Sequence, residues 1–149
     1  MSSTLEIAIF LSMNGRADEA IAFYKRHLHA KELMRVTYLE MAKVDDSILL
    51  TAENKNFISH SVLLIGRTKV MIAEENMNVS EGFVIGNNFS LCIQSAVENE
   101  IRQFYENLLT DSRVSIILPL AANSFSPAYG ILEDPFGVQI QFMYDKRLR

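Results

Sequence analysis

The chain has 149 residues, 49% of them hydrophobic, and carries a formal net charge of −4. This length predicts one domain, or two small similar halves that share a core, and the charge excludes the basic surface of a nucleic-acid-binding protein. Cys92 is the single cysteine, so an internal disulfide is excluded. The apolar run 7–13 is too short to span a bilayer and lacks the features of a secretory signal. We therefore expect a cytoplasmic protein that binds neither membranes nor nucleic acids.

The first half of the chain predicts a strand, a helix and three further strands. Residues 5–12 are rich in β-forming side chains, and the Asn14-Gly15 pair ends that strand. A helix is predicted over 17–28, because Asp18 and Glu19 suit a first turn and apolar residues follow at helical spacing. Further strands are expected at 32–41, 59–65 and 69–73, with a polar loop at 43–57 that contains a short element at 47–51.

The second half predicts the same order of elements. Residues 88–94 alternate as a strand does, and a helix with an apolar face is expected over 97–109. Ser95 followed by Glu98 is the pattern of a capping box at the start of this helix. A strand at 113–118 and a closing hairpin follow.

The closing hairpin predicts one wall of a binding pocket. Asp134 is expected to cap the turn by accepting backbone N–H groups, and Gly137 to supply a backbone conformation that most residues avoid. The strand 138–144 alternates, with valine, isoleucine, phenylalanine and tyrosine on one side. Its other side carries two glutamines and a methionine, which suit a cavity that is wet and selective.

The two predicted helices share a pattern of residues. Phe23-Tyr24 and Phe104-Tyr105 are each followed by a leucine five residues after the phenylalanine. Such self-similarity predicts an α+β fold in which a βαβββ module occurs twice; a chance likeness of two amphipathic helices is the alternative. We expect a single domain made of two repeats, 5–75 and 88–145, joined by a linker at 76–87.

Two runs of residues resemble a known family when they occur together. They are N-G-x-A-x-E-A-I-x-F-Y at 14–24 and Y-G-x-x-x-D-P-F-G-V at 129–138. The chain resembles the vicinal oxygen chelate superfamily of glyoxalases, bleomycin-resistance proteins and dioxygenases. More narrowly, it resembles the PhnB-like branch, often labelled a 3-demethylubiquinone-9 3-methyltransferase-like domain. The resemblance implies that the two modules form a cup-shaped mixed β-sheet and that the protein is a homodimer.

The resemblance also implies where a metal would be bound. In metal-dependent members, four side chains that point into the cup hold one divalent ion. Those positions fall at Ile9, at Met71 or Ala73, at Asn88 and at Gln141. Aliphatic and thioether side chains do not hold a hard divalent ion, and amides are weak neutral donors, so no metal or other cofactor is expected. If the assignment of these positions to the sequence were shifted by one or two residues, His60 or Glu74 would enter the site. The alternative of a metal site therefore stays open.

We therefore expect a metal-free dimer that binds a small, partly apolar molecule and has no assigned catalytic residue. The expected lining of the cup is Ile9, Met71, Asn88, Ser90, Cys92, Tyr129, Gln139, Gln141 and Met143. His27 and His29 are expected at the end of a helix, where histidine is favoured, rather than in a metal site. The alternatives are a divalent-metal-dependent lyase, isomerase or dioxygenase, a methyltransferase, for which no glycine-rich nucleotide turn is present, and an interaction protein without a ligand.

Overall fold

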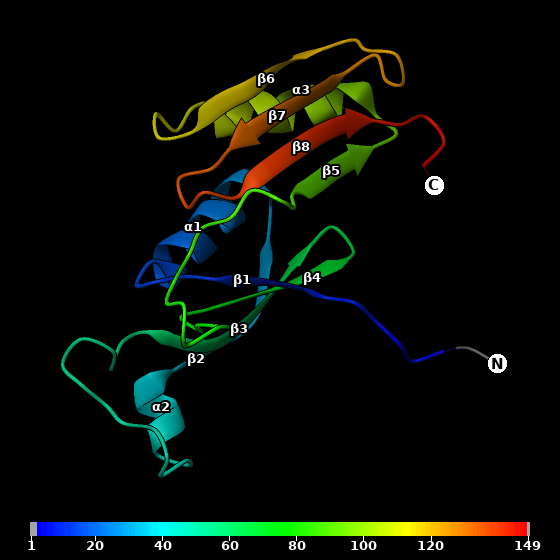
Figure 1. Ribbon diagram of the computed structural model, residues 1–149. Coiled ribbons are helices and arrows are strands. Elements are labelled where there is room, and N and C mark those ends of the chain that lie inside the picture. Colours follow the sequence, from blue (N-terminus) through cyan, green and yellow to red (C-terminus); the bar gives the residue numbers. More distant parts are fainter. Residues whose placement is uncertain (1–2, 149) are drawn as a thin grey trace. The chain divides into compact units, whose positions relative to one another are not determined.

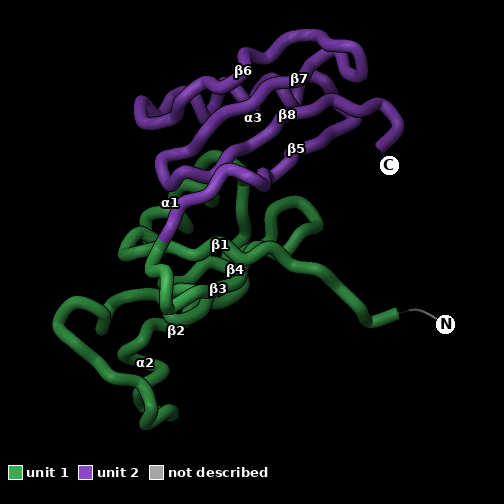
Figure 2. The backbone as a smooth tube through the Cα atoms, in the orientation of Figure 1, with its two compact units in different colours: residues 1–83 green, residues 84–149 purple. Residues whose placement is uncertain are grey.

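The computed structural model describes residues 3–148 and has an α+β fold of eight strands and three helices (Figure 1). The chain divides into two compact units, residues 1–83 and 84–149 (Figure 2). The boundary lies inside the segment 76–87 that the sequence suggests as a linker. Within the described part of the chain, no helix is long and apolar enough to cross a membrane.

Unit 1 is a four-stranded mixed sheet with the strand order β1-β4-β3-β2, and the sheet is not closed. The first and last strands pair in parallel, whereas the other neighbours are antiparallel. Helix α1 packs against β2, β3 and β4 and covers one face of the sheet. The elements are β1 (Ile9–Ser12), α1 (Ala17–His27), β2 (Lys31–Thr37), α2 (Tyr38–Ala42), β3 (Ile58–Ile65) and β4 (Thr68–Ala73).

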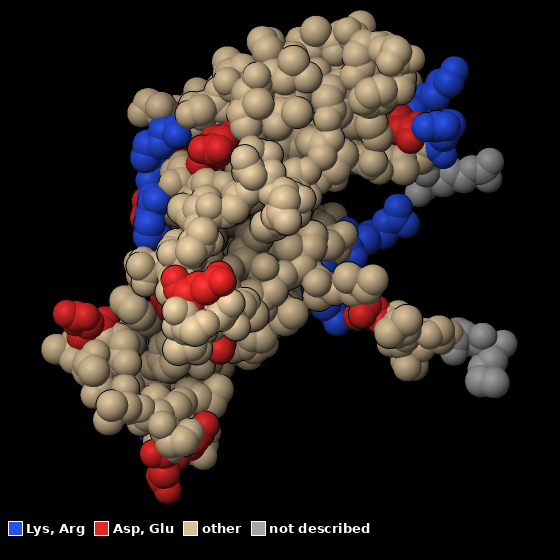
Figure 3. All heavy atoms as spheres, in the orientation of Figure 1, with Lys and Arg blue, Asp and Glu red and all other residues tan. Residues whose placement is uncertain are grey.

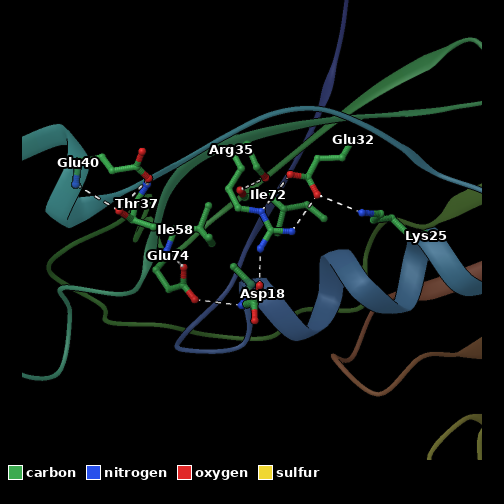
Figure 4. A network of polar contacts seen from close by, with 11 residues as sticks. Asp18, Lys25, Glu32, Arg35, Thr37, Glu40, Ile58, Ile72 and Glu74 are labelled. Atoms are coloured by element: carbon green, nitrogen blue, oxygen red, sulfur yellow. Dashed lines mark hydrogen bonds and ion pairs between the residues drawn. The ribbon is translucent and has the colours of Figure 1, made fainter.

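Helix α1 depends on a distant residue for its first turn. The first N–H groups of a helix have no partner within it, and the residue before α1 provides no side-chain cap. The carboxylate of Glu74, which follows β4, accepts the N–H of Ala17 at 2.9 Å (Figure 4). At the other end, His27 is buried and its ring lies 4.5 Å from that of Phe23, while His29 follows the helix as expected.

Ion pairs join α1 to the edge strand β2. The guanidinium of Arg35 contacts the carboxylates of Asp18 and Glu32, and Lys25 lies 3.3 Å from Glu32 (Figure 4). The Arg35 side chain therefore points to the face of the sheet that α1 covers. Because these pairs are partly exposed, each contributes on the order of 1 kcal/mol or less.

Unit 2 repeats this topology with the strand order β5-β8-β7-β6, again in an open sheet. The first and last strands are again parallel neighbours. Helix α3 packs on β5 and β8, and the ring of Tyr105 meets that of Phe142 edge to face, with centroids 5.6 Å apart. The elements are β5 (Leu91–Ser95), α3 (Glu98–Leu108), β6 (Ser115–Ala121), β7 (Tyr129–Glu133) and β8 (Gln139–Tyr144).

The predicted repeat is confirmed, because both units are βαβββ modules with equivalent strand orders. Helices α1 and α3 each have 11 residues. Phe23 and Phe104 each lie six residues after the first residue of their helix, and the next residue in each is a buried tyrosine. The helix boundaries agree with the predicted ones to within one residue.

Three local predictions are wrong. The strand expected at 32–41 ends at Thr37, because Thr37 and Glu40 form a capping box that begins α2: the Thr37 hydroxyl accepts the N–H of Glu40, and the Glu40 carboxylate accepts the N–H of Thr37. The expected capping box at Ser95 is absent from α3, whose N-cap is Val97. Ser95 ends β5, and its hydroxyl accepts the N–H of Val97 at 3.0 Å. The segment 43–57 is a loop, as expected, but residues 47–51 form no helix or strand.

The turn between β7 and β8 forms as predicted. The buried carboxylate of Asp134 accepts the N–H groups of Phe136 and Val138, both at 2.9 Å. Gly137 has φ +85°, and an added Cβ would lie 2.6 Å from Cγ2 of Ile85, so a larger residue would strain the backbone and displace the Ile85 side chain. These contacts hold the start of β8 in a fixed register with β7.

Candidate functional site

One face of the unit 2 sheet is covered by α3 and the other is open. Strand pairing places Gln141 beside Cys92 and Ile131, and Met143 beside Gln94 and Tyr129. We call this surface the open face of unit 2, and it comprises Cys92, Gln94, Tyr129, Ile131, Glu133, Gln139, Gln141 and Met143. Among the side chains that alternate with these, Ile140 and Phe142 are fully buried, and the ring of Phe142 packs on Tyr105 of α3.

A chain of hydrogen bonds crosses the open face of unit 2. The Tyr129 hydroxyl donates to Oε1 of Gln141, and Nε2 of Gln141 donates to the hydroxyl of Ser90, both at 2.5 Å. The ring of Phe125 packs edge to face on Tyr129, with centroids 5.1 Å apart. These contacts fix the Gln141 side chain, which lies beside Ile131 of β7 and two residues before Met143 on the same face of β8.

The groups in this chain are neutral at ordinary pH. Desolvation, and secondarily the neighbouring Cys92, raises the pKa of Tyr129, so its hydroxyl keeps the proton that it donates. Desolvation also raises the pKa of the Cys92 thiol, although the residue is solvent-exposed and the amide of Gln94 partly opposes the shift. A protonated thiol is a poor nucleophile. The arrangement is therefore suited to binding by hydrogen bonds rather than to nucleophilic attack.

Most of the site residues that the sequence suggests in unit 2 come together. Cys92, Tyr129, Gln139, Gln141 and Met143 share the open face, and Ser90 bonds to it. Asn88 does not join them, because β5 begins only at Leu91 and Asn88 lies exposed before it.

Sequence reasoning missed four residues of this site, Gln94, Ile131, Glu133 and Phe125. Alternation along β7 was the available signal for Ile131, since it puts residues 129, 131 and 133 on one side. The stacking of Phe125 on Tyr129 depends on the course of a loop, for which the sequence offers no comparable pattern.

The unit 1 sheet also has an open face. It comprises Phe10, Met34, Val36, His60, Val62 and Met71, as the strand register shows. Ile9 pairs with the buried Val70 on the face that α1 covers, so Ile9 and Met71 lie on opposite sides of the sheet. Phe10, not Ile9, stands beside Met71.

The residues that could hold a metal are dispersed. His60 lies on the open face of unit 1, whereas both oxygens of the Glu74 carboxylate accept backbone N–H groups, from Ala17 and Ile58. Across residues 3–148, no group of three or more histidine, cysteine, aspartate or glutamate side chains lies together. The amide, hydroxyl and thioether groups of the two open faces do not fit a hard divalent ion.

Comparisons with known proteins extend over nearly the whole chain. No family model matches the sequence. Protein YjdN of Escherichia coli (strain K12) is 24% identical over 139 residues, which are 90% of this chain and 91% of that protein.

Solved structures share the fold. A putative 3-demethylubiquinone-9 3-methyltransferase, PhnB protein, from Bacillus cereus matches with a TM-score of 0.71 and 23% identity, over 95% of this chain and 100% of that one. Protein PA1353 from Pseudomonas aeruginosa matches with a TM-score of 0.74 and 19% identity, over 95% and 98%. The fosfomycin resistance protein FosX from Listeria monocytogenes matches with a TM-score of 0.63 and 14% identity, over 96% and 94%.

Proposed function

We propose that this chain, whose fold is that of the vicinal oxygen chelate superfamily and its PhnB-like members, is a homodimeric binding protein for a small, partly apolar molecule. The molecule would occupy the open face of unit 2. Binding would require no catalytic metal. The alternative is a divalent-metal-dependent lyase, isomerase or dioxygenase with the same fold.

The hydrogen-bonded chain Ser90–Gln141–Tyr129 is the observation that carries this proposal. Small-molecule sites combine a mostly apolar lining with a few polar groups that are held in place. Here Gln141 is fixed on both sides, at 2.5 Å each. Ser90 acts as the acceptor in this chain, so its own O–H is a donor that a ligand can use. Ile131 on β7 and Met143 further along β8 offer apolar contact on the same face, and methionine adapts to ligands of different shapes.

The chemistry of the available donors supports binding over metal catalysis. A catalytic metal site needs about three protein ligands that offset dehydration of the ion. The positions that the family resemblance assigns to ligands carry Ile9, Met71 or Ala73, Asn88 and Gln141, and the first two positions have no donor for such an ion. Asn88 lies outside the strand and Ile9 faces α1, which further separates the set.

The test is the Gln141→Leu variant. Compounds that raise the melting temperature of the natural protein are first identified by a thermal-shift screen, and their affinities are measured by calorimetry. Leucine keeps the size of the side chain but removes both hydrogen bonds, so we expect affinity to fall by about tenfold, the effect of roughly 1.4 kcal/mol. Gln141 is only half-buried, so the variant should still fold.

Gln103→Leu is the matched control, because Gln103 is an exposed residue of α3. It should bind the same compounds with unchanged affinity. If the Gln141→Leu variant binds these compounds as tightly as the natural protein does, the open face of unit 2 is not the binding site. Elemental analysis of protein purified without chelators supplies the second criterion. About one nickel, zinc, manganese or iron ion per subunit, bound through His60 or Glu74, would support the enzyme alternative instead.

Strand β6 supports the proposed homodimer. It lies at the edge of the unit 2 sheet, and its sequence is almost entirely apolar. Ile116, Ile117 and Leu118 remain 52%, 47% and 42% exposed. An exposed apolar edge strand is a site where another chain can pair or pack, and a second copy of the protein would cover it.

Sedimentation tests this surface. The natural protein should sediment as a dimer at tens of micromolar, where a stable interface of ordinary size is occupied. Ile117→Lys should shift it toward monomer by at least about tenfold in Kd, because a charge would be buried. Ile7→Lys, at an exposed position of unit 1, is the control and should remain dimeric. A monomeric natural protein would refute the dimer, and a dimer that survives Ile117→Lys would place its interface elsewhere.

A further inference from the structure

Unit 1 contains a cavity of about 390 Å³ that the open faces do not include. It lies where β1 and β4 end and β3 begins, and its lining includes Met13, Tyr38, Phe57, Glu74, Asn76 and Phe83. Its volume is within the usual range for small-molecule sites. The residues come from four separate segments of unit 1, so the cavity is formed by the fold and not by one loop.

A carboxylate is fixed in the wall of this cavity. Glu74 is half-buried, and its two oxygens accept the N–H groups of Ala17 at 2.9 Å and Ile58 at 2.8 Å (Figure 4). The Tyr38 hydroxyl donates to the backbone carbonyl of Glu74 at 2.7 Å. Glu74 is thus held at a defined place, with its carboxylate in the wall of the cavity.

The electrostatic surroundings favour a positive charge. Desolvation raises the pKa of Glu74, and the nearby carboxylate of Asp18 adds to the shift. Desolvation also raises the pKa of Tyr38, with further contributions from Glu75 and Glu74. Over the α2 end of unit 1, the charged side chains visible on the face drawn in Figure 3 are acidic. A cation in the cavity would compensate the partly desolvated Glu74 carboxylate.

The rest of the wall is aromatic and polarisable. Tyr38, Phe57 and Phe83 bring three rings to the cavity, and Met13 adds a thioether. Aromatic rings attract a cation that has shed its water, and they also accommodate its apolar substituents. A carboxylate among aromatic rings therefore selects an organic cation over both a hydrated metal ion and a neutral molecule.

A purely structural role explains only part of this arrangement. Capping of α1 and β3 accounts for the position of the Glu74 carboxylate. It does not account for a cavity beside that carboxylate, or for the ring of Phe83, which is 38% exposed and contributes little to a core. When its side-chain amide is oriented to donate, Asn76 forms a hydrogen bond of 3.0 Å to the carbonyl of Gly82. This bond closes the loop 76–82, which is followed by Phe83 in the cavity wall.

We propose that this cavity binds a small organic ammonium ion, with the Glu74 carboxylate neutralising its charge and with Tyr38, Phe57 and Phe83 contacting its alkyl groups. This site is separate from the open face on which the proposed function rests. The two can therefore succeed or fail independently.

Choline and its neutral isostere 3,3-dimethyl-1-butanol provide the test, in an NMR titration of the ¹⁵N-labelled full chain at constant ionic strength. Choline should produce saturable shifts of the Ala17 and Ile58 amides, which donate to Glu74. The isostere, which lacks only the charge, should bind at least about tenfold more weakly. Phe83→Ala and Glu74→Gln should each weaken choline binding by about tenfold.

Phe83→Ala keeps the test decisive if Glu74→Gln does not fold, because Phe83 is partly exposed. Phe89→Ala, at an exposed position of unit 2, is the matched control and should bind choline normally. The proposal is overturned if the isostere binds as well as choline, if Phe83→Ala binds normally, or if the shifts fall on unit 2. The absence of saturable shifts at roughly 100 mM choline, where a millimolar site would be filled, also overturns it.

Discussion

Replacing Phe142 with alanine is expected to lower the free energy of unfolding by about 3–5 kcal/mol. Phe142 lies on β8, which pairs with both β5 and β7, and its side chain is 0% exposed. Its ring packs edge to face on Tyr105 of α3. The substitution removes the ring contact between β8 and α3 and leaves a cavity that the surrounding strands fill only in part.

Chemical denaturation of the natural protein and the variant measures this loss. Phe89→Ala is the control, since Phe89 is 55% exposed and precedes β5; it should change stability by less than about 1 kcal/mol. A loss of under about 1 kcal/mol for Phe142→Ala would mean that the packing of α3 on β8 is not as described.

Asp134→Ala is expected to destabilise the protein by about 3 kcal/mol. The buried Asp134 carboxylate accepts two N–H groups in the β7–β8 turn. Removal of the acceptor leaves the N–H groups of Phe136 and Val138 without it. Hydrogen bonds to a charged group contribute roughly 1.5–3 kcal/mol each. The two contributions are not fully additive, so we expect the lower end of their sum.

Two further variants separate the turn from general charge effects. Asp134→Asn keeps an oxygen at the Oδ1 position that accepts both N–H groups, so it should lose less than half as much stability as the alanine variant. Asp46→Ala removes an exposed aspartate in a loop and should have an effect within about 0.5 kcal/mol. Thermal unfolding and denaturant titration measure the stability of each variant. If Asp134→Ala and Asp134→Asn lose the same amount of stability, the Asp134 side chain does not cap the turn as described.

Residue patterns predicted the parts of the fold in which periodicity is strong. The alternation along β8 separated the buried Ile140 and Phe142 from Gln141 and Met143, and the structure confirms this division. The repeated Phe-Tyr pair located both helices, because side chains on a buried helix face must recur at helical spacing. The turn between the last strands was predictable because Asp134 and Gly137 each have a specific conformational role there.

Other features depend on contacts that a local pattern does not contain. Thr37 ends β2 because its capping box with Glu40 competes with strand pairing, although the residues before and after it have similar composition. The face to which Ile9 belongs is set by its parallel register with β4, some sixty residues later. The cavity around Glu74 is lined by segments that are far apart in the sequence, so no local pattern of residues could predict it.

The connection between the second and third strands differs between the two units. In unit 1 it covers residues 38–57 and includes α2, whereas in unit 2 it covers residues 122–128. Tyr38 and Phe57, which line the cavity, are the first and last residues of the longer connection. Since each doubling of a loop costs only about 0.6 kcal/mol of closure entropy, the sheet of unit 1 can carry the longer connection at little cost in stability. The two rings at its ends, Tyr38 and Phe57, are thus additions that the βαβββ topology tolerates and does not itself require.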